Sequence, residues 1–550
     1  MRAGLLLLLL SIAMWAQVPC PDTPAFSPCE ISFNLNPGES WTSAQIAAEV
    51  KSPRFRTFNT EAFWDGGTKL TLRVTPSEEG VWEVKLSSNL PRFDRQTIKF
   101  NALPSEARGF IQPANVHHWR YTGSLKGHLW LGIEIWDLAT AAEESFLTAK
   151  TQKATHIRTL FEPQWPPDPA RFQAFEKQVR ALNTDGILVD IVLAGPNGAL
   201  TKALPDPGLR DKYFRYAMAR LAPFNVTWEI VKDWETYPNG RTLLKDIGTL
   251  IKRWDPYDHP RSAYPIGSTS AFFRDGWMTH ILCNGEDPAI PALEHQSYPL
   301  PIVSIGKRQS AKVLWQAIAA GSYLGYGATK AIGETLENTR FWEMEPYFDV
   351  SNGKALFLEG TDYLLVVDRP GIVEVEVEKH GYNAAWIDAS SGERTVLKDY
   401  KGEHFIGEPP AKTGDWLLQL SRESRKEGML KSYKFESQPL LMQEGEVDPK
   451  RVPFEINIKD SADLKAGVPI PYEIRITKDS RATRFMQFQI TADVPTEGQG
   501  MRVITTQPKG TFILPTALAT KFPAVLNLRV AGMNANGKLY YIDRIVSLVK

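Results

Sequence analysis

The sequence predicts a multidomain protein in which a central (β/α)₈ TIM barrel is flanked by N-terminal and C-terminal β-sandwich (Ig-like) domains. The chain has 550 residues, which is too long for a single hydrophobic core. Short strands come first, strands then alternate with helices, and strands return towards the end. This succession of patterns, together with the length, predicts the three-part architecture.

Residues 31–112 have an all-β pattern. Thr68–Val74 and Val81–Leu86 alternate polar and apolar residues, and the segment Pro76–Gly80 between them is rich in turn formers. Ile31–Leu35 adds an earlier strand. We therefore expect a small β-sandwich over this range.

Strands and helices alternate over residues 125–350. Gly186–Leu193 is nearly all apolar, as is typical of a parallel strand that is buried on both faces. The length of the region is near the roughly 250 residues of a (β/α)₈ barrel. The expected strands are 129–135, 155–160, 186–193, 225–230 and 302–309, and the expected helices are 141–153, 168–182 and 209–222.

The last part of the chain returns to β-structure. Residues 351–421 are expected to form a small β domain, with strands at 363–367, 373–377 and 416–420. A charged linker is expected at 422–431, followed by a further β-sandwich module at 432–550.

Residues 1–16 have the pattern of a secretory signal peptide. Arg2 supplies a positive charge before the apolar run Leu5–Ile12. This run is shorter than the about 20 residues of a transmembrane helix. The three residues before Cys20 do not form the sequence that lipidation requires. We expect a secreted or periplasmic protein with no lipid and no transmembrane segment.

Cysteines and histidines give no metal or cofactor motif. Cys20 and Cys29 are close together in an exported chain, so a disulfide between them is an expectation that stays open. Cys283 is expected to be a buried thiol. His117–His118 and His156 lack metal-binding spacing and are expected to be core or solvated residues.

The charge balance limits the class of partner. Lys plus Arg and Asp plus Glu each number 63, so the formal net charge is zero. No basic excess draws the chain to nucleic acid or to an anionic membrane. A neutral ligand such as carbohydrate fits this balance, whereas the oligomeric state stays open.

Two groups of motifs resemble known modules. Phe63–Gly67 and Gly80–Trp82 are similar to the DUF5060 module, which precedes glycoside hydrolase barrels. Ile157–Arg158, Trp228–Glu229 and Asp255–Pro260 resemble the DUF4038-type glycosidase barrel.

The resemblance continues to about residue 420. Trp386–Gly392 and Asp415–Trp416 are similar to a C-terminal domain type that is named for collagen binding, although the name proves no such binding. The resemblance implies a glycoside hydrolase that acts on a poly- or oligosaccharide.

Glycoside hydrolysis usually requires two carboxyl groups, which in a barrel lie at the carboxyl ends of strands. The resemblance aligns Lys232 with the Asn and Asp233 with the Glu of a Trp-x-x-x-Asn-Glu pattern. Asp233 is therefore a candidate acid, although the adjacent lysine favours its ionised form and a salt-bridged surface role is the alternative. Glu229 is the second catalytic candidate, with a structural hydrogen-bonding role as the equal alternative.

The second catalytic carboxyl is missing from its usual place. In relatives a Glu ends the later strand that corresponds to the expected strand 302–309. Here no Asp or Glu occurs between Glu294 and Glu334. Either a carboxyl from elsewhere serves as nucleophile or base, or the site is inactive.

Other residues are candidates for binding a sugar. Glu134 and Asp137 follow the first strand and are suited to hydrogen-bonding hydroxyl groups. Arg158 would orient acids at the floor of the site or form a structural ion pair. Trp165, in a Pro-rich loop, and Trp228 are candidates for stacking on a sugar ring, with burial in the core as the alternative.

Three hypotheses follow from these observations. The chain is a glycoside hydrolase acting outside the cytoplasm, a catalytically inert barrel that binds glycans, or, with less support, a surface adhesion protein. The sugar, the linkage, the stereochemical outcome and the role of residues 432–550 stay open.

We predict that the mature protein begins between residues 14 and 20 and carries no lipid, because Ala13 and Ala16 are small residues suited to the cleavage point and Gln17–Pro19 do not form a lipidation sequence before Cys20. N-terminal sequencing and the intact mass of exported protein test this. A first residue Cys20 carrying acyl groups would contradict it.

Overall fold

The computed structural model describes residues 20, 22–307, 310–348, 350–422, 445–458, 463–480, 482–484, 486–494 and 502–550. The expected signal peptide and all but the first residue of the expected linker lie outside these ranges. The chain divides into two compact units, with the boundary after Ala107. Among the described residues, no helix combines the length and the hydrophobicity needed to cross a membrane.

The first unit consists of two sheets whose apolar faces form one core. Strand β2 alternates buried and exposed residues, as a strand with one face towards a core does. The strands expected near 31–35, 68–74 and 81–86 correspond to β2, β6 and β7. One sheet has the order β1 (Thr23–Pro24), β8 (Thr97–Leu103), β7 (Gly80–Ser88), β3 (Ile46–Lys51), β4 (Thr57–Glu61), and the other β2 (Cys29–Asn34), β6 (Lys69–Val74), β5 (Phe63–Trp64).

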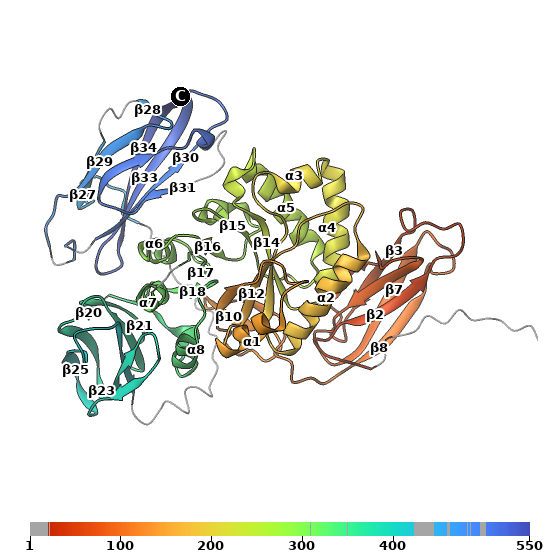
Figure 1. Cartoon of the computed structure of the whole chain (residues 1–550), viewed down its shortest axis with the longest axis horizontal. Coiled ribbons are helices and arrows are strands. Elements are labelled where there is room, and N and C mark those ends of the chain that lie inside the picture. Colours follow the sequence, from red (N-terminus) through yellow and green to blue (C-terminus); the bar gives the residue numbers. More distant parts are fainter. Residues whose placement is uncertain are drawn as a thin grey trace, which may run out of the picture. The chain divides into compact units, whose positions relative to one another are not determined.

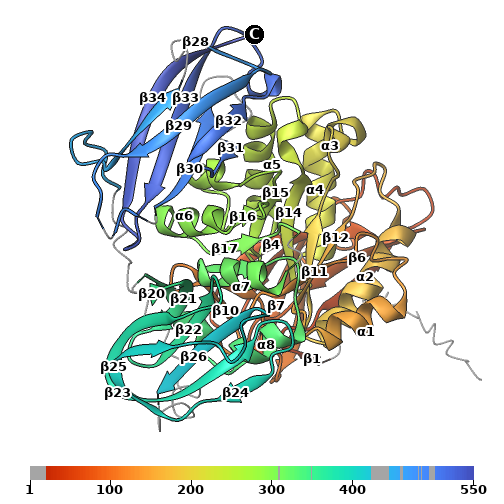
Figure 2. The ribbon, with the colours of Figure 1, turned by 60° about the vertical axis from the view of Figure 1, so that its left-hand side comes forward.

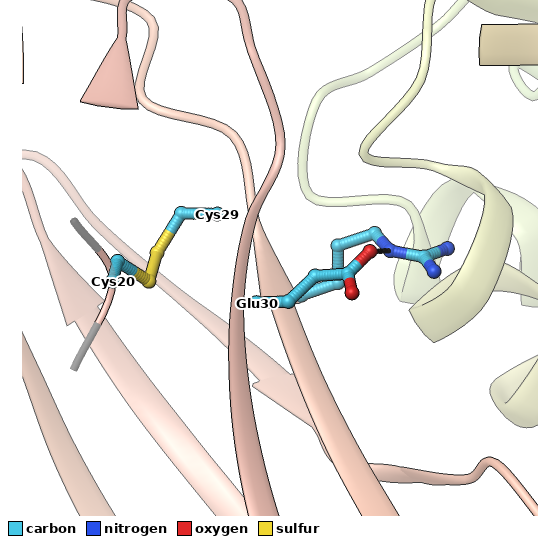
Figure 3. Close-up of a disulfide and its surroundings, with 4 residues drawn as sticks. Cys20, Cys29 and Glu30 are labelled. Atoms are coloured by element: carbon cyan, nitrogen blue, oxygen red, sulfur yellow. Dashed lines mark hydrogen bonds and ion pairs between the residues drawn. A yellow bond between two sulfur atoms is a disulfide. The ribbon is translucent and has the colours of Figure 1, made fainter. Parts of the chain in front are cut away.

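A disulfide joins Cys20 to Cys29 at the start of β2, with Cα atoms 5.6 Å apart (Figure 3). The two cysteines are nine residues apart in sequence, so the disulfide closes a short loop. Beside it, Glu30 accepts a hydrogen bond of 2.9 Å from Arg73 on the neighbouring strand β6. The expected pairing is thus present, and Cys283 is buried and outside any disulfide.

The second unit begins with the hairpin β9 (Ile111–Ala114) and β10 (His118–Tyr121) and continues with parallel strands that alternate with helices (Figure 1). The strands form a sheet of five, β11 (Gly132–Glu134), β12 (His156–Leu160), β13 (Leu188–Val192), β14 (Val226–Lys232), β15 (Arg261–Tyr264), and a sheet of three, β16 (Ile281–Cys283), β17 (Ile302–Ser304), β18 (Ser322–Leu324). The helices are α1 (Glu143–Thr151), α2 (Pro169–Thr184), α3 (Ala199–Ala203), α4 (Pro207–Leu221), α5 (Gly240–Trp254), α6 (Ala289–Ser297), α7 (Ala311–Ala319) and α8 (Lys330–Glu337), with 3₁₀ turns η1 (Trp234–Thr236), η2 (Ser270–Asp275) and η3 (Phe341–Glu343).

The two parallel sheets are joined by sparse links. A parallel bridge pairs Leu131, just before β11, with Leu324 of β18. At the other junction, an antiparallel bridge pairs Ser268 with Cys283. The described strands therefore form two sheets rather than one continuous ladder. Expected strands 129–135 and 302–309 are shorter in the structure, and positions 308 and 309 lie outside the described residues.

Local sequence signals explain the central elements. Asp168 accepts hydrogen bonds from the backbone of Ala170 and Arg171, and Pro169 occupies the first helical position of α2. The helix then buries an apolar face against the strands. All five residues of β13 are buried, because this strand lies between β12 and β14 and is covered on both faces.

The strands return after η3, and Figure 2 shows β21 and β22 beside helix α7. The first sheet has the order β19 (Glu345–Tyr347), β21 (Gly353–Leu358), β22 (Asp362–Val367), β26 (Trp416–Arg422), β23 (Val373–Asp388), β20 (Val350–Ser351), with β24 (Arg394–Val396) and β25 (Tyr400–Gly407) also paired to β23. The last segment has two sheets, β27 (Phe454–Ile458), β29 (Pro469–Ile476), β32 (Lys509–Ile513) and β28 (Asp463–Lys465), β34 (Leu539–Val549), β33 (Ala524–Met533), β30 (Gln487–Asp493), β31 (Arg502–Thr505), together with η4 (Thr516–Leu518).

Gly248 in α5 allows the indole of Trp277 to pack directly on the helix. A Cβ atom at this glycine would lie 2.3 Å from Cδ2 of Trp277, whose side chain is buried. We predict that Gly248→Ala lowers the free energy of unfolding by about 1–3 kcal/mol, since overpacking outweighs the gain in helix propensity. Urea unfolding measures the change.

Gly267→Ala is the matched control, because the nearest atom to its added Cβ is 3.9 Å away. Equal stability of Gly248→Ala and the unsubstituted protein would contradict the predicted clash.

Candidate functional site

Arg158 is the centre of a buried charge cluster near the carboxyl ends of the parallel strands. It lies on β12, and its Nε and Nη2 donate hydrogen bonds of 2.7–2.9 Å to the carboxylate of Glu229 on β14. Its Nη1 donates to the carbonyl of Gly325, just after β18, at 2.6 Å. A Cβ at position 325 would lie 2.7 Å from Nη2, so the close approach requires glycine.

A row of hydrogen bonds continues from this cluster through the interior. Asp190 on β13 accepts from His156 Nδ1 at 2.6 Å and from the hydroxyl of Thr227 at 2.8 Å. The Nε2 atoms of His156 and His128 are 2.7 Å apart, and the Tyr121 hydroxyl lies 2.7 Å from His128 Nδ1. His156 is therefore a core residue whose two ring nitrogens both have hydrogen-bond partners. A core position was one of the two alternatives expected from the sequence.

Burial controls the acidity of the carboxyl groups in the cluster. It raises the pKa of Glu229 and that of Asp190 to about 7, against the opposing charge of Arg158. Glu229 is fully buried, and both of its oxygens accept hydrogen bonds from Arg158. In this arrangement both oxygens of its carboxylate are occupied by Arg158, and the side chain is not exposed at the surface.

Glu134 connects the buried cluster to an exposed lysine. It ends β11, and its carboxylate lies 4.0 Å from Arg158 Nη1 and accepts a hydrogen bond of 3.2 Å from the Tyr264 hydroxyl. The ammonium of Lys307, which follows β17, is 3.4 Å from its other oxygen. Glu134 thus has partners on β12 and β15 and after β17. The last of these partners, Lys307, is exposed.

Aromatic rings and lysines surround this carboxylate. The ammonium of Lys232 lies 4.4 Å from the ring centre of Tyr264 and 5.5 Å from that of Trp136. The ammonium of Lys307 lies 5.7 Å from the ring centre of Tyr326. Trp136 and Tyr326 are half-buried, whereas Tyr264 is deeper and buried. The rings and the two ammonium groups therefore lie between Glu134 and the surface of this edge.

Asp233 follows β14 in a left-handed backbone conformation, with φ of 49°. Its carboxylate lies 3.4 Å from the ammonium of Lys232, and its side chain retains 23% of its exposed area. The predicted acid candidate is therefore paired with the lysine but accessible, unlike Glu229. Glu235 nearby accepts hydrogen bonds from the backbone of Ile266 and Gly267 and holds that loop.

Three of the predicted binding residues lie outside the cluster. Trp228 was expected as a stacking residue, but it is fully buried, and its indole donates to Asp255 at 2.8 Å. It adjoins Glu229 on an alternating strand and so points to the opposite face. Trp165 is half-buried against the core, and Asp137 is exposed and accepts from the backbone of Thr140 at 3.4 Å.

Sequence reasoning missed Tyr264, Lys307 and Tyr326 as members of the site. Each of them ends or follows a strand, which is the signal that would have identified them. The end of β17 carries no acid, as the sequence requires, and presents Lys307.

No family model matches the chain, and no curated protein matches it. Solved structures do match in fold. A proposed glycoside hydrolase from Bacteroides vulgatus has a TM-score of 0.62 at 15% identity, covering 73% of this chain and 100% of that chain. A family 5 glycoside hydrolase from Bacteroides vulgatus has a TM-score of 0.50 at 12% identity, covering 57% and 94%. A further structure, described as a glycoside hydrolase, has a TM-score of 0.50 at 12% identity, covering 58% and 98%. The chain therefore has a glycosidase-like fold.

Buried His280 gives the protein a specific response to acid. Burial, with help from the charge of Arg158, lowers the pKa of His280 from 6.5 to about 3. Its unfolded form binds a proton as the pH falls through 6.5 while the folded form does not, so this group makes the protein less stable at lower pH. His280→Phe is expected to be less stable than the unsubstituted protein. We predict that this difference in the free energy of unfolding is smaller by roughly 2 kcal/mol at pH 5 than at pH 7.

Urea unfolding of both proteins at the two pH values measures this difference, and other titrating groups cancel in the comparison. A deficit that is the same at pH 7 and pH 5 would show that His280 titrates normally in the folded protein.

Proposed function

We propose that the chain is an exported, carbohydrate-active protein whose glycosidase-like region is a (β/α)₈ barrel that binds a glycan and hydrolyses it weakly or not at all. The proposal includes the DUF5060-like, DUF4038-like and C-terminal modules inferred from sequence, with the glycan entering at the carboxyl ends of the strands. The similar fold of solved glycoside hydrolases supports the class but not the activity.

One observation carries the proposal that catalysis is impaired. Two carboxyl groups must flank the scissile bond, about 5–5.5 Å apart for retention or about 6.5–9.5 Å apart for inversion. Glu229 is fully buried and bound by Arg158. Where a carboxylate would end the seventh strand, β17 is followed by Lys307, and this ammonium pairs with Glu134.

The mouth of the site retains features that suit a sugar. A sugar ring offers C–H groups that pack on an aromatic face, and its hydroxyls require hydrogen-bond partners. Half-buried Trp136 and Tyr326 offer such faces, and Glu134, Lys232 and Lys307 offer polar groups around them. This combination supports binding without requiring bond cleavage.

A second candidate function is hydrolysis with inversion. It is favoured by the accessible carboxylate of Asp233 at the end of β14, where the resemblance aligns the general acid. Glu134 would then be the base that activates water. The Lys232 ammonium beside Asp233 favours the ionised form, which opposes the role of proton donor.

We predict binding without robust turnover. The full chain is titrated by calorimetry against a panel of neutral and uronic-acid glycans, and the same panel with chromogenic glycosides is assayed for hydrolysis. Trp136→Ala is expected to weaken binding by about tenfold, which corresponds to about 1.4 kcal/mol. Trp416→Ala, at a partly exposed tryptophan of β26, is the matched control and is expected to leave affinity unchanged.

The catalytic variants separate the two candidate functions. Asp233→Asn and Glu229→Gln are assayed beside the unsubstituted chain. Robust turnover that Asp233→Asn abolishes would establish the hydrolase and refute the inert site. Loss of turnover only in Glu229→Gln would instead show that the buried carboxyl is the acid. Absence of both binding and hydrolysis across the panel would favour the adhesion hypothesis.

A further inference from the structure

Three histidines surround one carboxylate away from the proposed sugar site. His295 Nε2 lies 2.9 Å and His117 Nδ1 lies 3.5 Å from the same oxygen, Oε2, of Glu345. His118 Nε2 lies 3.2 Å from the other oxygen. His117, His118 and His295 are each at most 5% exposed, and the rings of His117 and His295 have centres 3.8 Å apart.

The cluster lies at the amino-terminal edge of the parallel strands, opposite the edge that carries Glu134. His295 is in the last turn of α6, which leads into the beginning of β17. His117 and His118 belong to the hairpin before the first parallel strand, and Glu345 begins β19. The four side chains thus come from three segments that are distant in sequence.

The hydrogen bonds of His117 leave one nitrogen without a suitable partner. Its Nε2 lies 3.0 Å from the carbonyl oxygen of Tyr298, and a carbonyl only accepts, so Nε2 carries the proton. In the neutral ring, Nδ1 then presents a lone pair to Glu345 Oε2, so two acceptors face each other. Among the described residues, Nδ1 of His117 and Nε2 of His118 have the Glu345 oxygens as their nearest polar partners but do not meet hydrogen-bond geometry with them.

We infer that this cluster is a binding site for a first-row divalent cation such as Zn²⁺, with His117 Nδ1, His295 Nε2 and Glu345 as ligands. A tetrahedral zinc site with bonds of about 2.0–2.1 Å places its ligand atoms about 3.3–3.5 Å apart. The distance of 3.5 Å from His117 Nδ1 to Glu345 Oε2 lies in this range, and the 2.9 Å from His295 Nε2 would lengthen by about 0.4 Å on binding. The ligand atoms of all three residues lie within 4.8 Å of one another.

The surroundings hold the ligands in place as an outer shell does in metal sites. The Tyr298 carbonyl fixes the tautomer of His117, and the Tyr323 hydroxyl lies 2.8 Å from His118 Nδ1. Gly321 packs against the ring of His295 so closely that a Cβ would lie 2.3 Å from its Cδ2. Imidazole and carboxylate ligands suit zinc and its neighbours among the transition metals.

The site is suited to a structural role. The cation joins the β9–β10 hairpin, α6 and β19, and it neutralises the carboxylate of Glu345. The Glu345 side chain retains 29% of its exposed area, which leaves a path for the ion and room for water as a further ligand. His118 contacts the other carboxylate oxygen, Oε1, and so positions the Glu345 side chain. This inference is independent of the proposed sugar site.

The experiment is a zinc titration of the full chain. The protein is stripped with a chelator, dialysed and titrated with Zn²⁺ against a chromophoric competitor, and bound metal is counted by elemental analysis. We expect one zinc per chain, and a rise in the thermal unfolding midpoint on zinc addition because the ion binds the folded form. Glu345→Gln and His117→Phe are expected to weaken zinc binding at least tenfold and to lose the thermal shift.

His404→Gln is the matched control, because His404 lies beside Glu374 and Glu376 on an exposed sheet and should not affect the count. Glu345→Gln preserves the shape of the side chain and one accepting oxygen, so it keeps the test valid if His117→Phe fails to fold. Absence of zinc binding would mean that a proton, not a metal, separates His117 from Glu345, and would overturn the inference. Binding that is equally strong in Glu345→Gln would place the ion elsewhere and would also overturn it.

Discussion

The interior of the central region depends on one buried ion pair. Arg158 and Glu229 connect β12 to β14, and the bond from Arg158 to the Gly325 carbonyl extends this connection to the end of β18. Removing one member would leave a buried charge without its partner, which typically costs about 3–5 kcal/mol. The same pair occupies both oxygens of the Glu229 carboxylate on β14. The cluster therefore stabilises the interior and, in the function proposed above, also accounts for the impaired catalysis.

Much of the fold could be predicted because its signals are local. Asp168 and Pro169 begin α2 as the capping pattern requires, and the apolar run around β13 is buried as a parallel strand should be. The lengths of β11 and β17 were overestimated, since strand ends depend on the neighbouring strands with which they pair. For the same reason, sequence alone did not establish a closed barrel, and in the described part of the chain the two parallel sheets are joined by isolated bridges and a few backbone hydrogen bonds.

The site was harder to predict than the fold, because which side chains meet depends on the register between strands that are distant in sequence. Glu229 and Trp228 are adjacent in sequence, and both were candidates. Because side chains alternate along β14, Glu229 points into the charge cluster and Trp228 points towards Asp255. Tyr264 and Lys307 were missed because a position at a strand end indicates the edge of the sheet but not which strand ends meet at Glu134. The histidine cluster shows the same limitation, since no linear spacing relates His117 to Glu345.

The two edges of the parallel strands have different chemistry, and the difference follows from what closes each edge. At the carboxyl edge, buried Glu134 pairs with Lys307, whose side chain retains 62% of its exposed area, so this charge pair extends to the surface. At the amino edge, His117 and His295 are buried against Glu345, so only a small ion fits between them. Barrel proteins commonly bind ligands at the first edge and derive stability from the second. If the zinc site stabilises the amino edge as we infer, the proposed absence of a catalytic carboxyl pair at the other edge does not weaken the fold, and the proposed glycan binding requires no catalysis.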